Sequence, residues 1–188
     1  MRDAVERFQR AQALFGDRVD AVPAGAWEQP TALPGWSVRH LVGHLVEEQR
    51  WVTPLLRGET PEDIGDRFSG DLLGDDPVGA WEAATDEALG AFAAPEALER
   101  TVILSYGETP AAAYCAQMTA DLVVHAWDLA YAIGGVERLD DNLVTWTLAY
   151  AEEHVDGSGS PGLFEAAVDV SDTADPQTRL LARCGRRT

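Results

Sequence analysis

The chain has 188 residues, the size of one domain, and 46% of them are hydrophobic. Its formal net charge is -18, from 32 acidic and 14 basic residues. This balance argues against nucleic acid and anionic membrane surfaces as partners, because both bind clustered cations. A solvated acidic surface is the simplest explanation of the charge.

The two cysteines, Cys115 and Cys184, form no Cys-x-x-Cys pair. A zinc ribbon, a thioredoxin-type redox pair and an iron–sulfur site are therefore not indicated. We expect Cys115 to be a core thiol, whereas Cys184, near the end of the sequence, could be exposed. The first residues are polar, and no apolar run approaches the roughly 18 residues of a membrane span. We therefore expect a cytoplasmic protein with reduced thiols.

Hydrophobic spacing predicts helices in the first half of the chain. The first runs from Arg2 to about Val22, and the second from Val38 to about Arg57 with Ser37 as its N-cap. Pro54 is expected to kink or end the second helix near Thr53. Residues 58–76, rich in Gly, Pro and Asp, are predicted to be irregular and are our candidate for a lid.

The second half begins with a predicted helix over residues 77–93 and a β-like segment, 100–106, that ends at a glycine. Thr109 and Pro110 open a long helix to Ile133, closed by two glycines. The remaining predictions are a helix from Asp140 to about Val155, a flexible break at 157–162, an extended piece at 164–170 and a short helix at 175–183.

These elements predict an all-α fold, an antiparallel four-helix bundle with short accessory helices and a short C-terminal tail. We expect a metal-binding bundle domain in residues 1–157 and a tail, residues 158–188, that packs on it. Bundle cores commonly hold metal sites built from side chains of facing helices.

Metal-ligand side chains occur at helical spacing in two runs of the sequence. Asp121 and His125 are four residues apart and share one helix face. Met by His44 from the other run, they would form a three-ligand site for a divalent metal with room for a fourth ligand. His40, which follows an arginine, is expected to face solvent. His154 is explained by its place at the C-terminus of a helix.

Spacing alone leaves a second explanation open for each of these residues. Asp121 is costly to bury unless it is paired or binds a cation, and it could instead accept a hydrogen bond from His125. Asp128 could orient a histidine or cap a neighbouring helix end. The tryptophans near the two runs could line a substrate pocket or simply belong to the core: Trp36, Trp51 and Trp127.

Three segments together resemble a known family. The stretch Leu33–Leu45, with Pro34-Gly35-Trp36-Ser37 and His44, is similar to the entry motif of the mycothiol-dependent maleylpyruvate isomerase N-terminal domain, part of the DinB-like four-helix superfamily. Residues 121–130, with His125-Ala126-Trp127-Asp128-Leu129-Ala130, resemble its second motif. Residues 175–186 resemble the tail of stand-alone members.

The resemblance implies a DinB-like bundle with a divalent metal, usually zinc although nickel or another ion is possible, on His44, Asp121 and His125. It also implies mycothiol as thiol cosubstrate, and we take Trp36 and Trp127 as candidate cofactor-binding residues. A thiol at the open metal position would become a thiolate nucleophile. We therefore expect a metal-dependent thiol S-transferase or isomerase acting on a small electrophilic molecule, as a monomer or homodimer.

Two departures from the isomerase argue against maleylpyruvate itself as the substrate. The isomerase has glutamate at the position of Asp121, which is one methylene shorter. It also has a further C-terminal domain, whereas residues 157–188 are all that follow the predicted bundle here. The alternatives are a non-catalytic metal-binding or interaction protein on the same bundle and a metal-dependent hydrolase. The sequence offers no Ser–His–Asp or Cys–His nucleophile pattern and no phosphate-binding loop motif.

Overall fold

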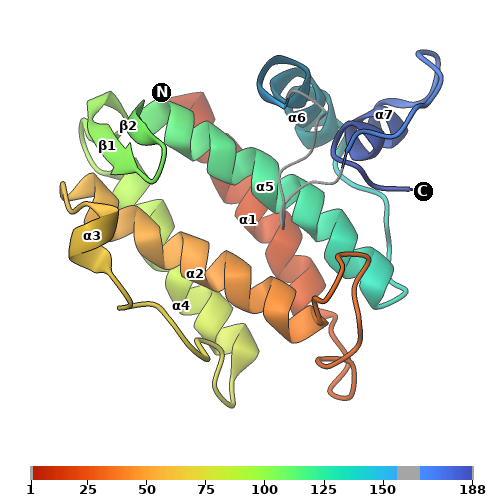
Figure 1. Cartoon of the computed structure of the whole chain (residues 1–188), viewed down its shortest axis with the longest axis horizontal. Helices are drawn as coiled ribbons and strands as arrows, with labels where there is room; N and C mark the ends of the chain where they lie inside the picture. Colours follow the sequence, from red (N-terminus) through yellow and green to blue (C-terminus); the bar gives the residue numbers. More distant parts are fainter. Residues whose placement is uncertain (1, 156–165, 188) are drawn as a thin grey trace.

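Four long helices form the body of the protein in a computed structural model that describes residues 2–155 and 166–187. Helix α1 packs against α4 and α5, and α2 packs against the other sides of α4 and α5 (Figure 1). The predicted all-α, DinB-like bundle is thus confirmed. The four helices are α1 (Arg2–Asp20), α2 (Val38–Leu56), α4 (Pro77–Ala93) and α5 (Ala111–Ala132).

Short elements cover one end and one side of the bundle (Figure 1). Strands β1 (Thr101–Leu104) and β2 (Gly107–Pro110) pair as an antiparallel hairpin immediately before α5. Helices α6 (Asp141–His154) and α7 (Pro176–Arg183) pack against each other, and α6 also packs against α5. The two shortest helices are α3 (Pro61–Ile64) and the 3-10 turn η1 (Ala97–Glu99).

Side-chain caps explain why these helices begin where they do. The Ser37 hydroxyl accepts a hydrogen bond from the backbone N–H of His40 at the start of α2. Asp140 and Asp175 cap α6 and α7 in the same way. In the core, aromatic pairs join the helices. Phe8 of α1 contacts Phe92 of α4 edge-on, with ring centroids 5.1 Å apart.

The structure corrects several local predictions. Helix α1 ends at Asp20, and α2 does not end near Thr53 but continues to Leu56. Pro54 is tolerated because it lies in the last turn of α2, where it removes a single backbone donor. Residues 58–76 are not wholly irregular, because Thr60 and Asp63 form a reciprocal capping box that starts α3.

Further corrections concern the second half of the chain. Residues 107–110, placed in a turn and at the start of a helix, form strand β2. Residues 166–170 belong to no strand, although Val168 donates a backbone hydrogen bond to the carbonyl of Ala182. The predicted break at 157–162 and the first part of the predicted extended piece, 164–165, lie outside the described residues.

Both cysteines are buried. Cys115 is a core residue, as predicted, but Cys184 is not exposed: its side chain is covered at the end of α7. Burial raises the pKa of each thiol to about 12. Among the described helices, none combines the length and the hydropathy that crossing a bilayer would require.

Candidate metal centre

Three metal-ligand residues converge where α2 and α5 run side by side. His44 comes from the middle of α2, and Asp121 and His125 come from successive turns of α5. One ligand atom from each residue lies within 4.8 Å of the others, and within the described residues this is the one such group of three or more His, Cys, Asp or Glu side chains. The structure therefore brings together the three residues that the sequence singled out as metal-ligand candidates.

Three potential metal-binding atoms of this triad lack a hydrogen-bond partner. His44 Nε2, Asp121 Oδ2 and His125 Nε2 are all buried and make no hydrogen bond within the part of the chain that the structure describes. Leaving one such atom unsatisfied costs about 1–3 kcal/mol, so three in one cluster call for a bound ion. The donor set, two imidazoles and one carboxylate, suits zinc and leaves a coordination position open.

The alternative explanation of Asp121, a hydrogen bond from His125, fits the geometry poorly. His125 Nε2 and Asp121 Oδ1 are 3.5 Å apart, which is too long for a strong hydrogen bond. The other nitrogen of the same ring, His125 Nδ1, lies 2.8 Å from Asp128 Oδ2. The bond to Asp128 fixes the ring and leaves Nε2 directed to the triad, which is the arrangement typical of metal-binding histidines.

Asp128 is itself held by Arg186 from the segment after α7. Arg186 donates from Nε to Asp128 Oδ1 at 3.0 Å and from Nη2 to Asp128 Oδ2 at 2.7 Å. The carboxylate of Asp128 is fully buried and Arg186 is 6% exposed. The C-terminal segment thus supports the candidate ligand His125 through a buried ion pair, and Asp128 holds the ring of this histidine, as the orienting role considered for it requires.

The electrostatic surroundings differ between the two histidines. Burial lowers the pKa of His44 to about 4, so its imidazole is neutral at pH 7 and ready to bind a metal. Burial also disfavours the charged form of His125, but the carboxylates of Asp121 and Asp128 outweigh this and raise its pKa. The pKa of Asp128 is lowered because hydrogen bonds from His125 and Arg186 outweigh its burial.

Trp36 covers the triad from the loop before α2. Its ring meets His44 edge-on at a centroid distance of 5.1 Å and lies nearly parallel to that of His125 at 6.3 Å. The ring of Trp36 also stacks on that of the exposed His40, with ring centroids 4.4 Å apart. His40 therefore faces solvent as predicted, and Trp36 stands where a molecule bound to the triad would touch it.

Trp127 lies in a different environment. Its side chain is 1% exposed, stacks on Tyr131 and borders a separate pocket that Arg186 also lines. A cofactor-binding role for Trp36 and Trp127 stays a prediction.

His154, at the end of α6, is exposed and its Nδ1 lies 3.0 Å from the carbonyl oxygen of Tyr150, as expected for a helix-end histidine.

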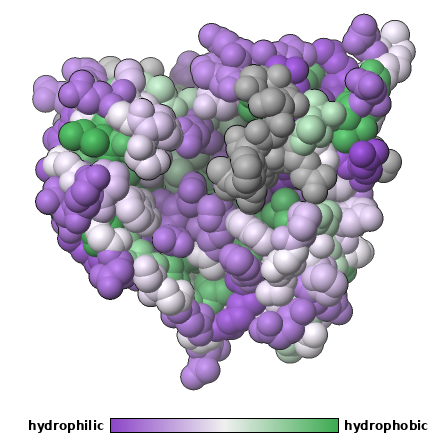
Figure 2. Space-filling view, viewed as in Figure 1, coloured by the Kyte–Doolittle hydropathy of each residue, from purple (hydrophilic) through white to green (hydrophobic). Residues whose placement is uncertain are grey.

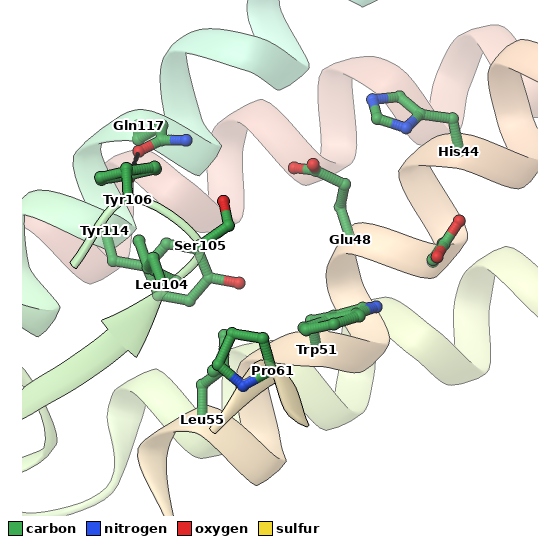
Figure 3. A pocket seen from close by; sticks show the side chains of 11 residues that line it. His44, Glu48, Trp51, Leu55, Pro61, Leu104, Ser105, Tyr106, Tyr114 and Gln117 are labelled. Carbon is green, nitrogen blue, oxygen red and sulfur yellow. Dashed lines mark hydrogen bonds between the residues drawn. The ribbon is translucent and has the colours of Figure 1, made fainter. Parts of the chain in front are cut away.

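A cavity of about 310 Å³ opens beside His44, between α2, α3 and the β-hairpin (Figure 3). Figure 3 shows the His44 ring and the Glu48 carboxylate at one end and Trp51 and Pro61 along one side. Burial, with added repulsion from Asp121 and Glu47, raises the pKa of Glu48 to about 8. The cavity is lined by His44, Glu47, Glu48, Trp51, Leu55, Pro61, Leu104, Ser105, Tyr106, Tyr114 and Gln117.

A second hollow, of about 510 Å³, lies on the other side of His44 and is bordered by Trp36 and residues 70–73. Leu73 of this loop would meet a Cβ at Gly43 at 3.9 Å, so Gly43 faces the loop rather than another helix. Arg39 anchors the loop through Asp71 at 2.7 Å. Hydrophilic side chains gather over the middle of this face of the molecule (Figure 2).

Two residues of the centre were not found from the sequence. Glu48 follows His44 by four residues, the same spacing that linked Asp121 and His125, so a signal for it existed. Arg186 is 58 residues from Asp128, and no spacing rule connects them.

Comparison with known proteins places this centre in a family. Two uncharacterized proteins of Mycobacterium tuberculosis, from strains CDC 1551 / Oshkosh and H37Rv, are each 32% identical in an alignment of 193 positions, gaps included, that covers 98% of this chain and 98% of theirs. A crystal structure of a mutant of the mycothiol-dependent maleylpyruvate isomerase shares the fold with a TM-score of 0.66 and 15% identity, over 85% of this chain and 72% of that chain.

A second crystal structure of the isomerase gives a TM-score of 0.62 at 15% identity, over 80% of this chain and 68% of that chain. The model of the mycothiol maleylpyruvate isomerase N-terminal domain matches residues 8–130. This range includes α2, α5 up to residue 130 and all three residues of the triad. The chain therefore belongs to the mycothiol maleylpyruvate isomerase N-terminal domain family.

Proposed function

We propose that this protein is a metal-dependent thiol S-transferase or isomerase that joins a mycothiol-type thiol to a small electrophilic molecule. The observation that carries the proposal is the cluster of unpaired donor atoms from His44, Asp121 and His125 beside a cavity. Family membership supports the choice of thiol, since the related isomerase is mycothiol-dependent. The cytoplasmic location expected from the sequence is part of the proposal.

His44, Asp121 and His125 would hold the metal, most simply zinc. A divalent metal at this site would lower the pKa of a bound thiol, which makes the thiolate available near neutral pH. The protein groups supply the geometry: Asp128 and Arg186 fix the ring of His125, and α2 fixes His44 at the edge of the cavity. An electrophile in the cavity would thus lie next to the sulfur.

Two reactions follow from that placement. In a displacement, a carbon–sulfur bond forms and the leaving group departs with its bonding electrons. In an addition to an activated double bond, the thiol hydrogen ends on the neighbouring carbon. Rotation about the former double bond, now a carbon–carbon single bond, followed by elimination of the thiol gives the other geometric isomer, with no net consumption of thiol.

The protein's own thiols do not compete for this role. Cys115 and Cys184 are buried, and burial raises the pKa of each to about 12, so neither is a thiolate at neutral pH. The nucleophile therefore has to come from a separate thiol molecule. The open hollows on both sides of His44 provide space for two reactants.

Conjugation of a chlorodinitroarene with mycothiol, followed by absorbance, tests the proposal. The zinc-loaded protein is expected to accelerate the reaction, and a chelator or the His44→Ala substitution should abolish the acceleration. The control is His40→Ala, which removes an exposed histidine of the same helix. A zinc-loaded, folded protein that leaves the rate unchanged with mycothiol and with other low-molecular-weight thiols would favour the non-catalytic metal-binding alternative.

A further inference from the structure

The cavity beside His44 has an unusual distribution of charge. Two carboxylates, those of Glu47 and Glu48, border it, and none of its lining residues is arginine or lysine. Within the described residues, neither carboxylate makes a hydrogen bond or an ion pair with another side chain, whereas most buried charges are paired. The one potentially cationic side chain on the wall, His44, belongs to the triad.

Cations from neighbouring segments are held elsewhere. Every one of the 14 basic residues is an arginine. Arg39 binds Asp71 at 2.7 Å, Arg67 binds Glu59 at 2.6 Å, and Arg100 donates to the carbonyl of Leu56 at 2.9 Å. Arg50 and Arg57, on or at the end of α2, are not among the lining residues. No bidentate arginine clamp for a carboxylate is therefore present on the described walls of this cavity.

A bound metal does not reverse this charge once the thiol is in place. A divalent ion together with the Asp121 carboxylate and a thiolate is neutral overall. The field inside the cavity is then set by Glu47 and, at pH values above its pKa of about 8, also by Glu48. These carboxylates would repel a further anion in a partly enclosed space of low effective dielectric constant.

The rest of the lining offers neutral contacts. Figure 3 shows Ser105, Tyr106 and Gln117 across the cavity from Trp51. The Tyr106 hydroxyl donates to the side-chain oxygen of Gln117, which leaves the Gln117 amide N–H groups as donors to a ligand. Aromatic walls with a few neutral polar groups suit a flat, uncharged molecule, and unpartnered carboxylates suit a cation.

We propose that the electrophile accepted by this cavity is a flat, uncharged or cationic compound, and that molecules bearing a carboxylate are excluded by Glu47, with Glu48 adding to the repulsion when it is ionised. This inference rests on the proposed function, because it assigns the substrate class of the same site. It also separates this chain from an enzyme for dicarboxylic acids.

Two matched probes test the inference: 2-chloro-1,3-dinitrobenzene, which is uncharged, and 4-chloro-3,5-dinitrobenzoate, which has the same chlorodinitrophenyl ring with one added carboxylate. Each enzymatic kcat/KM with mycothiol is divided by the uncatalysed rate of the same probe. For the zinc-loaded protein we expect the uncharged probe to be favoured by at least about tenfold. The double variant Glu47→Gln, Glu48→Gln should raise the normalised kcat/KM of the anionic probe and so bring the values of the two probes closer together. Glu87→Gln, at an exposed site on α4, should leave both values unchanged.

Unreactive analogues separate this inference from the proposed function. Binding of 1,3-dinitrobenzene and 3,5-dinitrobenzoate to the zinc-loaded protein is measured by equilibrium dialysis, which needs no turnover. Preferential binding of the uncharged analogue that the double variant abolishes supports the charge selection even if neither chloro compound reacts. Equal or better binding of the anion, a preference unchanged in the double variant, or no binding of either analogue would overturn it.

Discussion

His125 Nδ1 and Asp128 Oδ2 lie 2.8 Å apart in the interior of α5, and both side chains are fully buried. The same carboxylate accepts two hydrogen bonds from Arg186. The candidate ligand His125 is therefore oriented by a residue close to the C-terminal end of the described chain. This connection makes the segment after α7 part of the candidate metal centre.

Substitution of Arg186 should weaken metal binding although Arg186 does not touch the triad. In Arg186→Gln, Asp128 loses its ion pair and holds the His125 ring less firmly, and we expect zinc affinity to fall about 10- to 100-fold. Isothermal titration with zinc measures this change. Arg187→Gln, at the exposed neighbouring position, should bind zinc like the wild type. Unchanged affinity in a folded Arg186→Gln protein would show that the ion pair is only structural.

The length of the acidic ligand can be tested at Asp121. Asp121→Glu restores the side chain that we expect in the isomerase, and it should retain zinc because a carboxylate is still present. Asp121→Asn removes the charge and should weaken binding by more than about a hundredfold, since a direct ligand contributes at least as much as its hydrogen-bonded partner. Equal zinc affinity in Asp121→Asn and wild type would mean that this side chain is not a ligand.

The raised pKa of Glu48 predicts a pH-dependent effect on the stability of the metal-free protein. Its pKa is about 8 in the folded state and 4.5 ordinarily, so between these values the folded state binds a proton that the unfolded chain has released. Stability therefore falls as pH rises through this window. Glu48→Gln should stabilise the protein at pH 9, by at most about 5 kcal/mol for the full shift, and have no effect near pH 4.

Urea denaturation in the presence of a chelator measures this difference, with Glu87→Gln as the exposed control. We expect added zinc to reduce the stability that Glu48→Gln gains at pH 9, because a nearby cation favours the ionised carboxylate of Glu48 in the wild type. A gain of the same size at pH 4 and pH 9 would show that the substitution acts through packing and not through charge.

The cysteines should be chemically silent. Because Cys115 and Cys184 are buried and the pKa of each is raised to about 12, iodoacetamide at pH 8 should modify neither in the folded protein and both after denaturation. Mass spectrometry of the alkylated protein checks this. Rapid modification of either thiol under native conditions would mean that a cysteine of the protein could itself act as the nucleophile.

The helices and the triad could be predicted from the sequence because both depend on local spacing. Helix α4 runs from Pro77 to Ala93 as expected, with Asp76 as its cap. Asp121 and His125 share a helix face through their four-residue spacing. Pairing them with His44 required two helices to pack together. The place of His44 in the other helical run made it the candidate partner, and the resemblance to a family supported that choice.

Contacts between distant segments could not be predicted in this way. Arg186 reaches Asp128 because the segment after α7 folds back onto the bundle, which no local pattern records. Cys184 is buried by the same packing. Strand β2 was missed because its four residues are stabilised by pairing with β1 and not by their own β-propensity. Glu48, by contrast, follows His44 by four residues, a helical spacing that the sequence shows.

The metal content of the purified protein decides whether His44, Asp121 and His125 bind a metal. After zinc loading and removal of free metal, we predict about one zinc per chain by inductively coupled plasma mass spectrometry, as expected for one three-ligand site. His44→Ala and His125→Ala should lose the metal while His40→Ala retains it. A folded wild-type protein that takes up no zinc or nickel, or a His44→Ala protein that binds as much as wild type, would contradict a metal centre at this site.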